Sequence, residues 1–136
     1  MNSDLYNYIQ QNILPKYHCF DKAHNINHIQ TVINESLSLA KLYHLNEDMV
    51  YVIAAYHDIG ILQGRELHHI YSAEYLMNDK NLLQWFTMEE LQIMKEAIED
   101  HRASAKNTPR SIYGCLIADA DRDLDPESVI KRTIQF

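Results

Sequence analysis

The stretch VIAAYHDIGIL, which runs from Val52 to Leu62, places a histidine and an aspartate side by side at the end of an apolar run. The apolar run predicts a helix that is buried over most of its surface. Two adjacent titratable side chains are costly in such a place unless they are hydrogen-bonded or share a cation. We therefore expect His57 and Asp58 to mark a functional site.

Length and composition limit the class of protein. A chain of 136 residues fits one domain, residues 1–136, that buries a core without disulfides. The two cysteines form no CxxC pair, the first residues do not resemble a signal peptide, and no apolar run is long enough to span a bilayer. These features predict a soluble, cytoplasmic protein.

Charge argues against one class of partner. The chain has 12 Lys and Arg against 19 Asp and Glu, which gives a formal net charge of −7. A nucleic-acid polymer would need clustered basic residues, so we expect no such partner, and we expect no membrane association. An anionic small molecule would need a local positive charge, which a bound metal ion can supply.

The pattern of apolar residues predicts an all-α fold of about six helices. The chain has three glycines and three prolines and lacks strongly alternating β-branched segments, which disfavours sheets. The expected helices cover residues 26–44, a segment capped by Asn46 that ends near Gly60, residues 68–77, a segment from a Thr87 and Glu90 capping box to His101, and two that open at Thr108-Pro109 and Asp125-Pro126.

Histidines and aspartates recur at or next to the apolar stripes of these helices. They are His28, His57 with Asp58, His101, and Asp119 or Asp121 in IADADRD. Imidazoles and carboxylates buried together are stable when they share a cation, and mixed His and Asp ligands suit a divalent metal such as Mn, Fe, Ni, Zn or Mg. Taken singly, a histidine such as His101 is more often a hydrogen-bonded core or boundary residue.

These residues together resemble the HD superfamily of metal-dependent phosphohydrolases. The match comprises His28, the doublet His57-Asp58 in AAYHDIG, and Asp121 in ADADR. The segments FDKAHNINHIQTV, HHIYSAEYL and AIEDH stand at the family's usual relative positions, so the resemblance covers residues 20–125. It implies a single compact HD-domain helical bundle.

The resemblance also implies metal ligands. His28, His57, Asp58 and Asp121 are the implied ligands, and Asp58 is the one that can bridge two ions. His68 and His101 stand where relatives with two ions have further ligands, and where relatives with one ion contact substrate phosphate. One or two divalent ions are therefore both compatible with this sequence.

Other residues near the motifs are candidates for catalysis and substrate binding. Asp58, His101 and Asp119 form the expected catalytic group. Three roles are open for Asp119: a carboxylate on the helix face, a hydrogen-bond acceptor for a ligand imidazole, or an acid or base. Contacts with the substrate are expected from His24, Arg65, His68, Arg102 and Lys106. His24 lies either in the cleft or in the loop that enters the helix carrying His28.

The implied activity is hydrolysis of a small phosphomonoester or nucleotide by a metal-activated water. Two alternatives stay open: a di-iron oxygenase of the same fold, and a non-catalytic module that binds a metal or a nucleotide. The motif DADRDLDP departs from the family's common DADRLDA, and many relatives continue with helices that wall the active site. We expect the C-terminal helices to be incomplete at Phe136, and a homo-oligomer is compatible with an uncovered apolar face.

Overall fold

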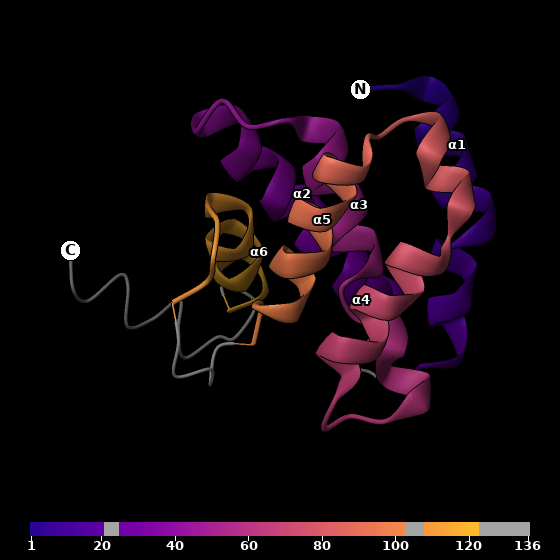
Figure 1. Cartoon of the computed structure of the whole chain (residues 1–136). Helices are drawn as coiled ribbons and strands as arrows, with labels where there is room; N and C mark the ends of the chain where they lie inside the picture. The colour runs from indigo at the N-terminus through magenta and orange to yellow at the C-terminus, as the bar shows by residue number, and fades with distance from the viewer. Residues whose placement is uncertain (21–24, 103–107, 123–136) are drawn as a thin grey trace.

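The computed structural model describes residues 1–20, 25–102 and 108–122, and these ranges contain helices and no strand (Figure 1). The all-α prediction is therefore confirmed. None of the described helices has the length and hydropathy needed to cross a bilayer. The elements in chain order are α1 (Ser3–Asn12), η1 (Leu14–Cys19), α2 (Ile26–Leu42), α3 (Glu47–Tyr56), η2 (Ile59–Gln63), α4 (His68–Asn78), η3 (Lys80–Gln84), α5 (Met88–Glu99) and α6 (Ile112–Arg122), where η denotes a short 3₁₀ helix.

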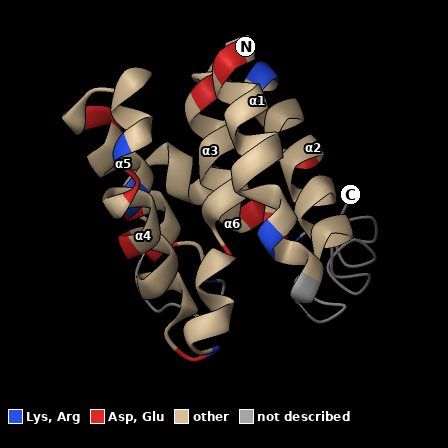
Figure 2. Cartoon of the chain, turned by 90° about the vertical axis from the view of Figure 1, so that its right-hand side faces the viewer, with Lys and Arg blue, Asp and Glu red and all other residues tan. Residues whose placement is uncertain are grey.

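Helix α3 forms the centre of the core. Every residue from Met49 to Tyr56 is buried, which explains why this run is apolar on all sides. Helices α1, α2, α4, α5 and α6 all contact α3. Figure 2 shows Lys and Arg scattered among Asp and Glu without a continuous basic stripe on the face in view. The polar residues that follow α3 therefore emerge at the meeting point of its neighbours.

Several helices begin where the sequence predicts. The Asn46 side chain accepts a hydrogen bond from the Met49 amide at 3.2 Å, so the predicted cap of α3 is confirmed. Helix α5 begins with the predicted capping box, in which Thr87 and Glu90 each accept a hydrogen bond from the other's backbone amide. These caps satisfy amides that the first turn of a helix otherwise leaves without partners.

The predicted end of α3 near Gly60 is wrong. The helix ends at Tyr56, and Gly60 lies in η2, where its amide donates to the Ser72 hydroxyl at 2.8 Å. A Cβ atom on Gly60 would stand 2.6 Å from the backbone oxygen of His68 and 2.6 Å from the backbone nitrogen of Ser72. Glycine is therefore required here because the chain after the HD doublet packs directly against the backbone of α4.

Two other boundaries differ from the prediction. Helix α6 begins at Ile112 rather than at Thr108, because the Arg110 amide donates to the Asp100 carboxylate at 2.9 Å and ties this segment to the end of α5. Helix α1 was not predicted, although Asn2 caps it and its inner face is apolar. The helix expected at Asp125-Pro126 lies outside the described residues.

Helix α2 ends in a left-handed residue. His44 has a φ angle of 57°, and the Leu45 amide donates to the Ala40 carbonyl at 2.9 Å. The His44 amide also approaches the Lys41 carbonyl at 3.4 Å, which completes the hydrogen-bond pattern that usually has glycine at the left-handed position. His44 is exposed, so no packing explains a side chain at this strained position.

Replacing His44 by glycine should stabilise the protein. The substitution relieves the left-handed strain of a side chain, so the free energy of unfolding should rise by roughly 1 kcal/mol in urea denaturation. The control is Thr31→Gly, an exposed right-handed position within α2, which should lower it by about 0.5 kcal/mol. A His44→Gly protein no more stable than the wild type would contradict this account of the helix end.

Gly60→Ala should have the opposite effect. Because the nearest atoms belong to the α4 backbone, the added methyl group must push α4 away, and the free energy of unfolding should fall by about 1–3 kcal/mol. The same denaturation experiment measures this loss. Unchanged stability would mean that η2 and α4 do not pack as closely as the structure shows.

Candidate metal centre

Six histidine and aspartate side chains meet where several helices begin or end. His28 lies in the first turn of α2, His57 caps the end of α3 and Asp58 follows it, His68 begins α4, His101 follows α5, and Asp121 lies in the last turn of α6. Within the described ranges they form two groups whose possible ligand atoms lie within 4.8 Å of one another, and Asp58 belongs to both.

The first group consists of His28, His57, Asp58 and Asp121. The His28 Nε2 atom lies 3.2 Å from Asp121 Oδ1 and 3.4 Å from Asp58 Oδ2. The His57 Nε2 atom lies 3.4 Å from Asp58 Oδ2 and 3.6 Å from Asp121 Oδ1. Two imidazole nitrogens thus face the same two carboxylate oxygens, an arrangement that encloses one point with four ligand atoms.

The second group consists of Asp58, His68 and His101. It uses the other oxygen of Asp58, because Oδ1 lies 3.2 Å from His68 Nε2 and 3.8 Å from His101 Nε2. The Nε2 atoms of His68 and His101 are 3.3 Å apart. The carboxylate of Asp58 therefore presents one oxygen to each group, which is the geometry needed to bridge two ions.

Backbone carbonyls orient three of the imidazoles in the same way. The Nδ1 atom of His57 lies 2.7 Å from the Ala54 carbonyl, that of His68 lies 2.8 Å from the Arg65 carbonyl, and that of His101 lies 2.5 Å from the Ile98 carbonyl. A carbonyl oxygen can only accept, so Nδ1 carries the proton in each ring. In the neutral rings the Nε2 lone pairs then point to the shared centre, as in histidines that bind metals.

The doublet itself is deeply buried. His57 is fully buried and Asp58 is 2% exposed. The buried Tyr17 hydroxyl donates to the Ala55 carbonyl at 2.6 Å and so fixes the end of α3. His57 Nε2 has no hydrogen-bond partner in the described part of the chain. The nearest polar atoms are carboxylate oxygens of Asp58 and Asp121, so this buried nitrogen needs either a proton of its own or a cation between it and those oxygens.

The pKa values of the ligands reflect this crowding of unlike charges. Although burial opposes ionisation, the neighbouring histidines hold the pKa of Asp58 well below its usual value, led by His57 and followed by His28 and His68. Burial also opposes protonation of His28, but hydrogen bonds to Asp121 and Asp58 raise its pKa to about 9. Burial, followed by the positive charge of His57, lowers the pKa of His101 to about 4. His101 is thus neutral at physiological pH, the form that ligates metals.

These residues fit a divalent cation. The buried Asp58 carboxylate and the partly exposed Asp121 carboxylate create a demand for positive charge that protons on His28 and His57 can meet, and a divalent ion meets it with release of those protons. Imidazole nitrogens with carboxylate oxygens are a ligand set for Mn, Fe, Ni or Zn. The geometry thus supplies a ligand set for one ion on His28, His57, Asp58 and Asp121, and for a second on Asp58, His68 and His101.

The structure does not bring all predicted site residues together. Asp119 lies outside both groups: its carboxylate pairs with Arg122 at 3.5 Å and lines a groove between α2 and α6. Arg65 is exposed in the loop before α4, and Arg102 contacts that loop rather than a ligand. His24 and Lys106 fall outside the described residues.

Some contributions to the site had no sequence signal. The carbonyls of Ala54, Arg65 and Ile98 act through the backbone, so no residue type announces them. Each nevertheless lies three residues before a ligand histidine. A histidine placed just after the end of a helix is a signal for this arrangement, because the last carbonyls of a helix are open to side chains.

Comparisons with known proteins agree with this geometry. The HD domain family profile matches residues 25–124. The crystal structure of a predicted HD superfamily hydrolase from an uncultured Thermotogales bacterium superposes with a TM-score of 0.72 and is 25% identical, over 97% of this chain and 73% of that chain. A search of curated proteins found no match. With most of its length matched by the family profile, the chain belongs to the HD domain family.

Proposed function

We propose that this protein is a metal-dependent phosphohydrolase that acts on a small phosphomonoester or nucleotide. The observation that carries the proposal is the buried Asp58 carboxylate, which offers one oxygen to each of two histidine groups. Membership of the HD domain family and the likeness to a protein described as a predicted hydrolase support it.

A bound divalent ion would supply a water of lowered pKa and would neutralise phosphate oxygens. The protein's own part is to hold the ligands: His57 and His101 keep their Nε2 atoms directed inward through their Nδ1 contacts to carbonyls. His28 and Asp121 close the first group from α2 and α6. In a net acidic protein, such a centre concentrates the positive charge that an anionic substrate requires.

The roles of His68 and His101 differ between a two-ion and a one-ion version of this chemistry. Were two ions bound, both histidines would serve as ligands of the second ion, and the Asp58 carboxylate would be shared by the two groups. With one ion bound, their Nε2 atoms are available to contact phosphate or to move a proton at the leaving oxygen. Both versions use the same carboxylate, and neither requires a covalent enzyme intermediate.

The division of Asp58 between two groups also favours a second candidate, a di-iron oxygenase. The six ligands suit two iron ions as well as two hydrolytic metals. Iron content and oxygen uptake separate the two candidates. Two irons per chain with substrate-dependent oxygen uptake would favour the oxygenase, whereas phosphate release with Mn²⁺ and no oxygen uptake would favour the hydrolase.

Asp58→Ala should abolish both metal binding and phosphate release. Because both groups share this carboxylate, affinity for Mn²⁺ should fall by at least about 100-fold, and hydrolysis of a panel of phosphomonoesters and nucleotides should be lost. Asp58→Asn keeps the shape of the side chain and should lose metal in the same way. The exposed carboxylate variant Asp4→Asn is the control. Full hydrolysis by the Asp58 variants would refute the proposal.

The number of ions can be tested separately. We expect elemental analysis of Mn²⁺-loaded wild type, purified without a histidine tag, to find two ions per chain. His68→Ala and His101→Ala should each retain one ion, because the four ligands of the first group remain intact. One ion that survives both substitutions would instead indicate a mononuclear site, in which these histidines face the substrate.

A further inference from the structure

The two histidines that belong only to the second group lie at helix ends and not within helices. His101 follows the end of α5, and His68 is the first residue of α4. The N-terminus of α4 has no side-chain cap, because Leu67 occupies the cap position. The orientation of His68 therefore depends on the loop that precedes it.

The backbone of that loop, residues 64–67, makes a hydrogen bond to the His68 side chain. Gly64 has a φ angle of 148°, a conformation that side chains rarely adopt. One residue later, the Arg65 carbonyl accepts the hydrogen bond from His68 Nδ1 at 2.8 Å, which sets the direction of the ring. Displacement of residues 64–67 would therefore rotate or shift His68 Nε2 relative to Asp58.

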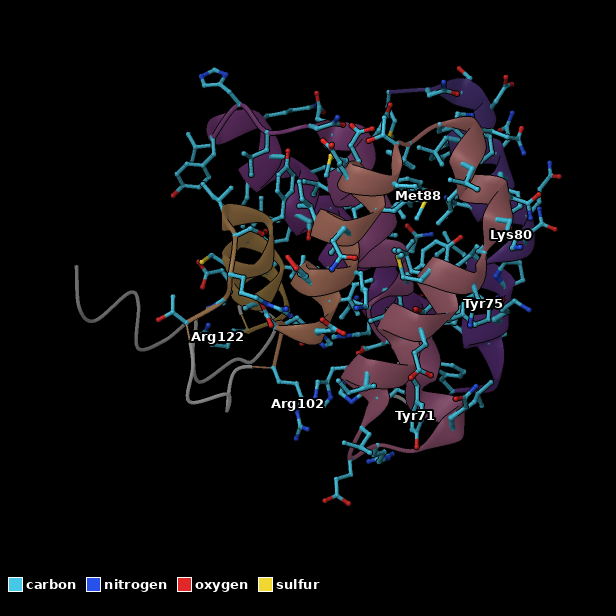
Figure 3. The ribbon with its side chains drawn as sticks, viewed as in Figure 1. Tyr71, Tyr75, Lys80, Met88, Arg102 and Arg122 are labelled. Atoms are coloured by element: carbon cyan, nitrogen blue, oxygen red, sulfur yellow. The ribbon has the colours of Figure 1, made fainter. Side chains whose placement is uncertain are left out.

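The Arg102 side chain joins this loop to the segment that carries the other histidine of the group. Arg102 directly follows His101, and its Nη1 atom donates to the Glu66 carbonyl at 2.6 Å. Figure 3 shows Arg102 leaving the end of α5 beside the beginning of α4. The contact connects two segments far apart in sequence, each of which carries one ligand of the second group.

We propose that Arg102 is a positioning residue for the second metal ion, which fixes the loop 64–67 through the Glu66 carbonyl and so holds His68 facing His101. The proposal rests on the two-ion form of the proposed function. Arg102 has no contact with the first group in the described structure, so its removal should weaken the second ion selectively. A residue that only bound phosphate would instead change KM and leave ion binding unchanged.

The first experiment titrates metal-free protein with Mn²⁺ by calorimetry. Arg102→Ala should weaken the second ion by about 10–100-fold, the usual cost of losing a contact that orients a metal ligand, and should leave the first within about twofold. Arg102→Lys should fall between the alanine variant and the wild type, because an ammonium group can still donate one hydrogen bond to a carbonyl.

Arg110→Ala is the matched control. Arg110 also lies near the end of α5, but its guanidinium pairs with Glu99 and Asp100 and has no described contact with the loop 64–67. This variant should bind both ions like the wild type. Hydrogen exchange of the metal-free proteins gives a readout independent of any ion, and amides of residues 64–68 should exchange faster in Arg102→Ala than in wild type or Arg110→Ala.

Several results would overturn the proposal. The first is an Arg102→Ala protein that binds the second ion with wild-type affinity. The second is an equal loss of affinity for both ions in that variant. The third is a wild-type protein that binds only one ion. Ion titration needs no substrate, so absence of hydrolysis would count against the proposed function and leave this inference standing. Two ions bound normally by Arg102→Ala, with a raised KM for a phosphomonoester, would assign Arg102 to the substrate.

Discussion

The burial of the Asp58 carboxylate is the constraint on which the rest of the structure depends. An ionised carboxylate that is 2% exposed carries a desolvation cost of several kcal/mol, which only nearby positive charge and hydrogen bonds can offset. The partners come from separate elements, since His28, His68 and His101 belong to α2, α4 and the segment after α5. Each of these elements must therefore reach the end of α3, and the packing of the domain follows from that requirement.

Helix ends contribute to the charge balance at this point. Helices α3 and α5 both end at the site, and their Ala54 and Ile98 carbonyls point to the Nδ1 atoms of the histidines that follow. The C-terminal end of a helix carries partial negative charge and favours cations nearby. The N-termini of α2 and α4 also lie at the site and oppose this effect, so the two carboxylates create most of the demand for a cation at the centre.

Much of the fold could be predicted from the sequence, because helical periodicity and caps indicate where helices lie. The ligand set was predicted from the resemblance to the HD superfamily, since spacing alone does not single out these residues. The resemblance indicated Asp121 as a ligand, and helical spacing agrees: Asp121 lies four residues after the buried Ile117 and shares its face, whereas Asp119 lies two residues away on another face. The roles of Gly60 and of the backbone carbonyls could not, because they depend on how closely η2 and α4 approach in space. Arg102 illustrates the same limit: its basic character suggested a phosphate contact, but its partner is a backbone carbonyl that no sequence pattern reveals.

The two groups differ in the structural elements that position their ligands. His28 lies in the first turn of α2, where its backbone amide donates a hydrogen bond to the Asn25 side chain at 3.2 Å. Asp121 lies within α6, and both helices pack against α3. His68, in contrast, takes its orientation from a glycine-containing loop. Asp58 directly follows α3, so its position does not depend on that loop. The first group is therefore carried by helices packed on α3, whereas one ligand of the second group depends on the backbone of the loop that precedes α4.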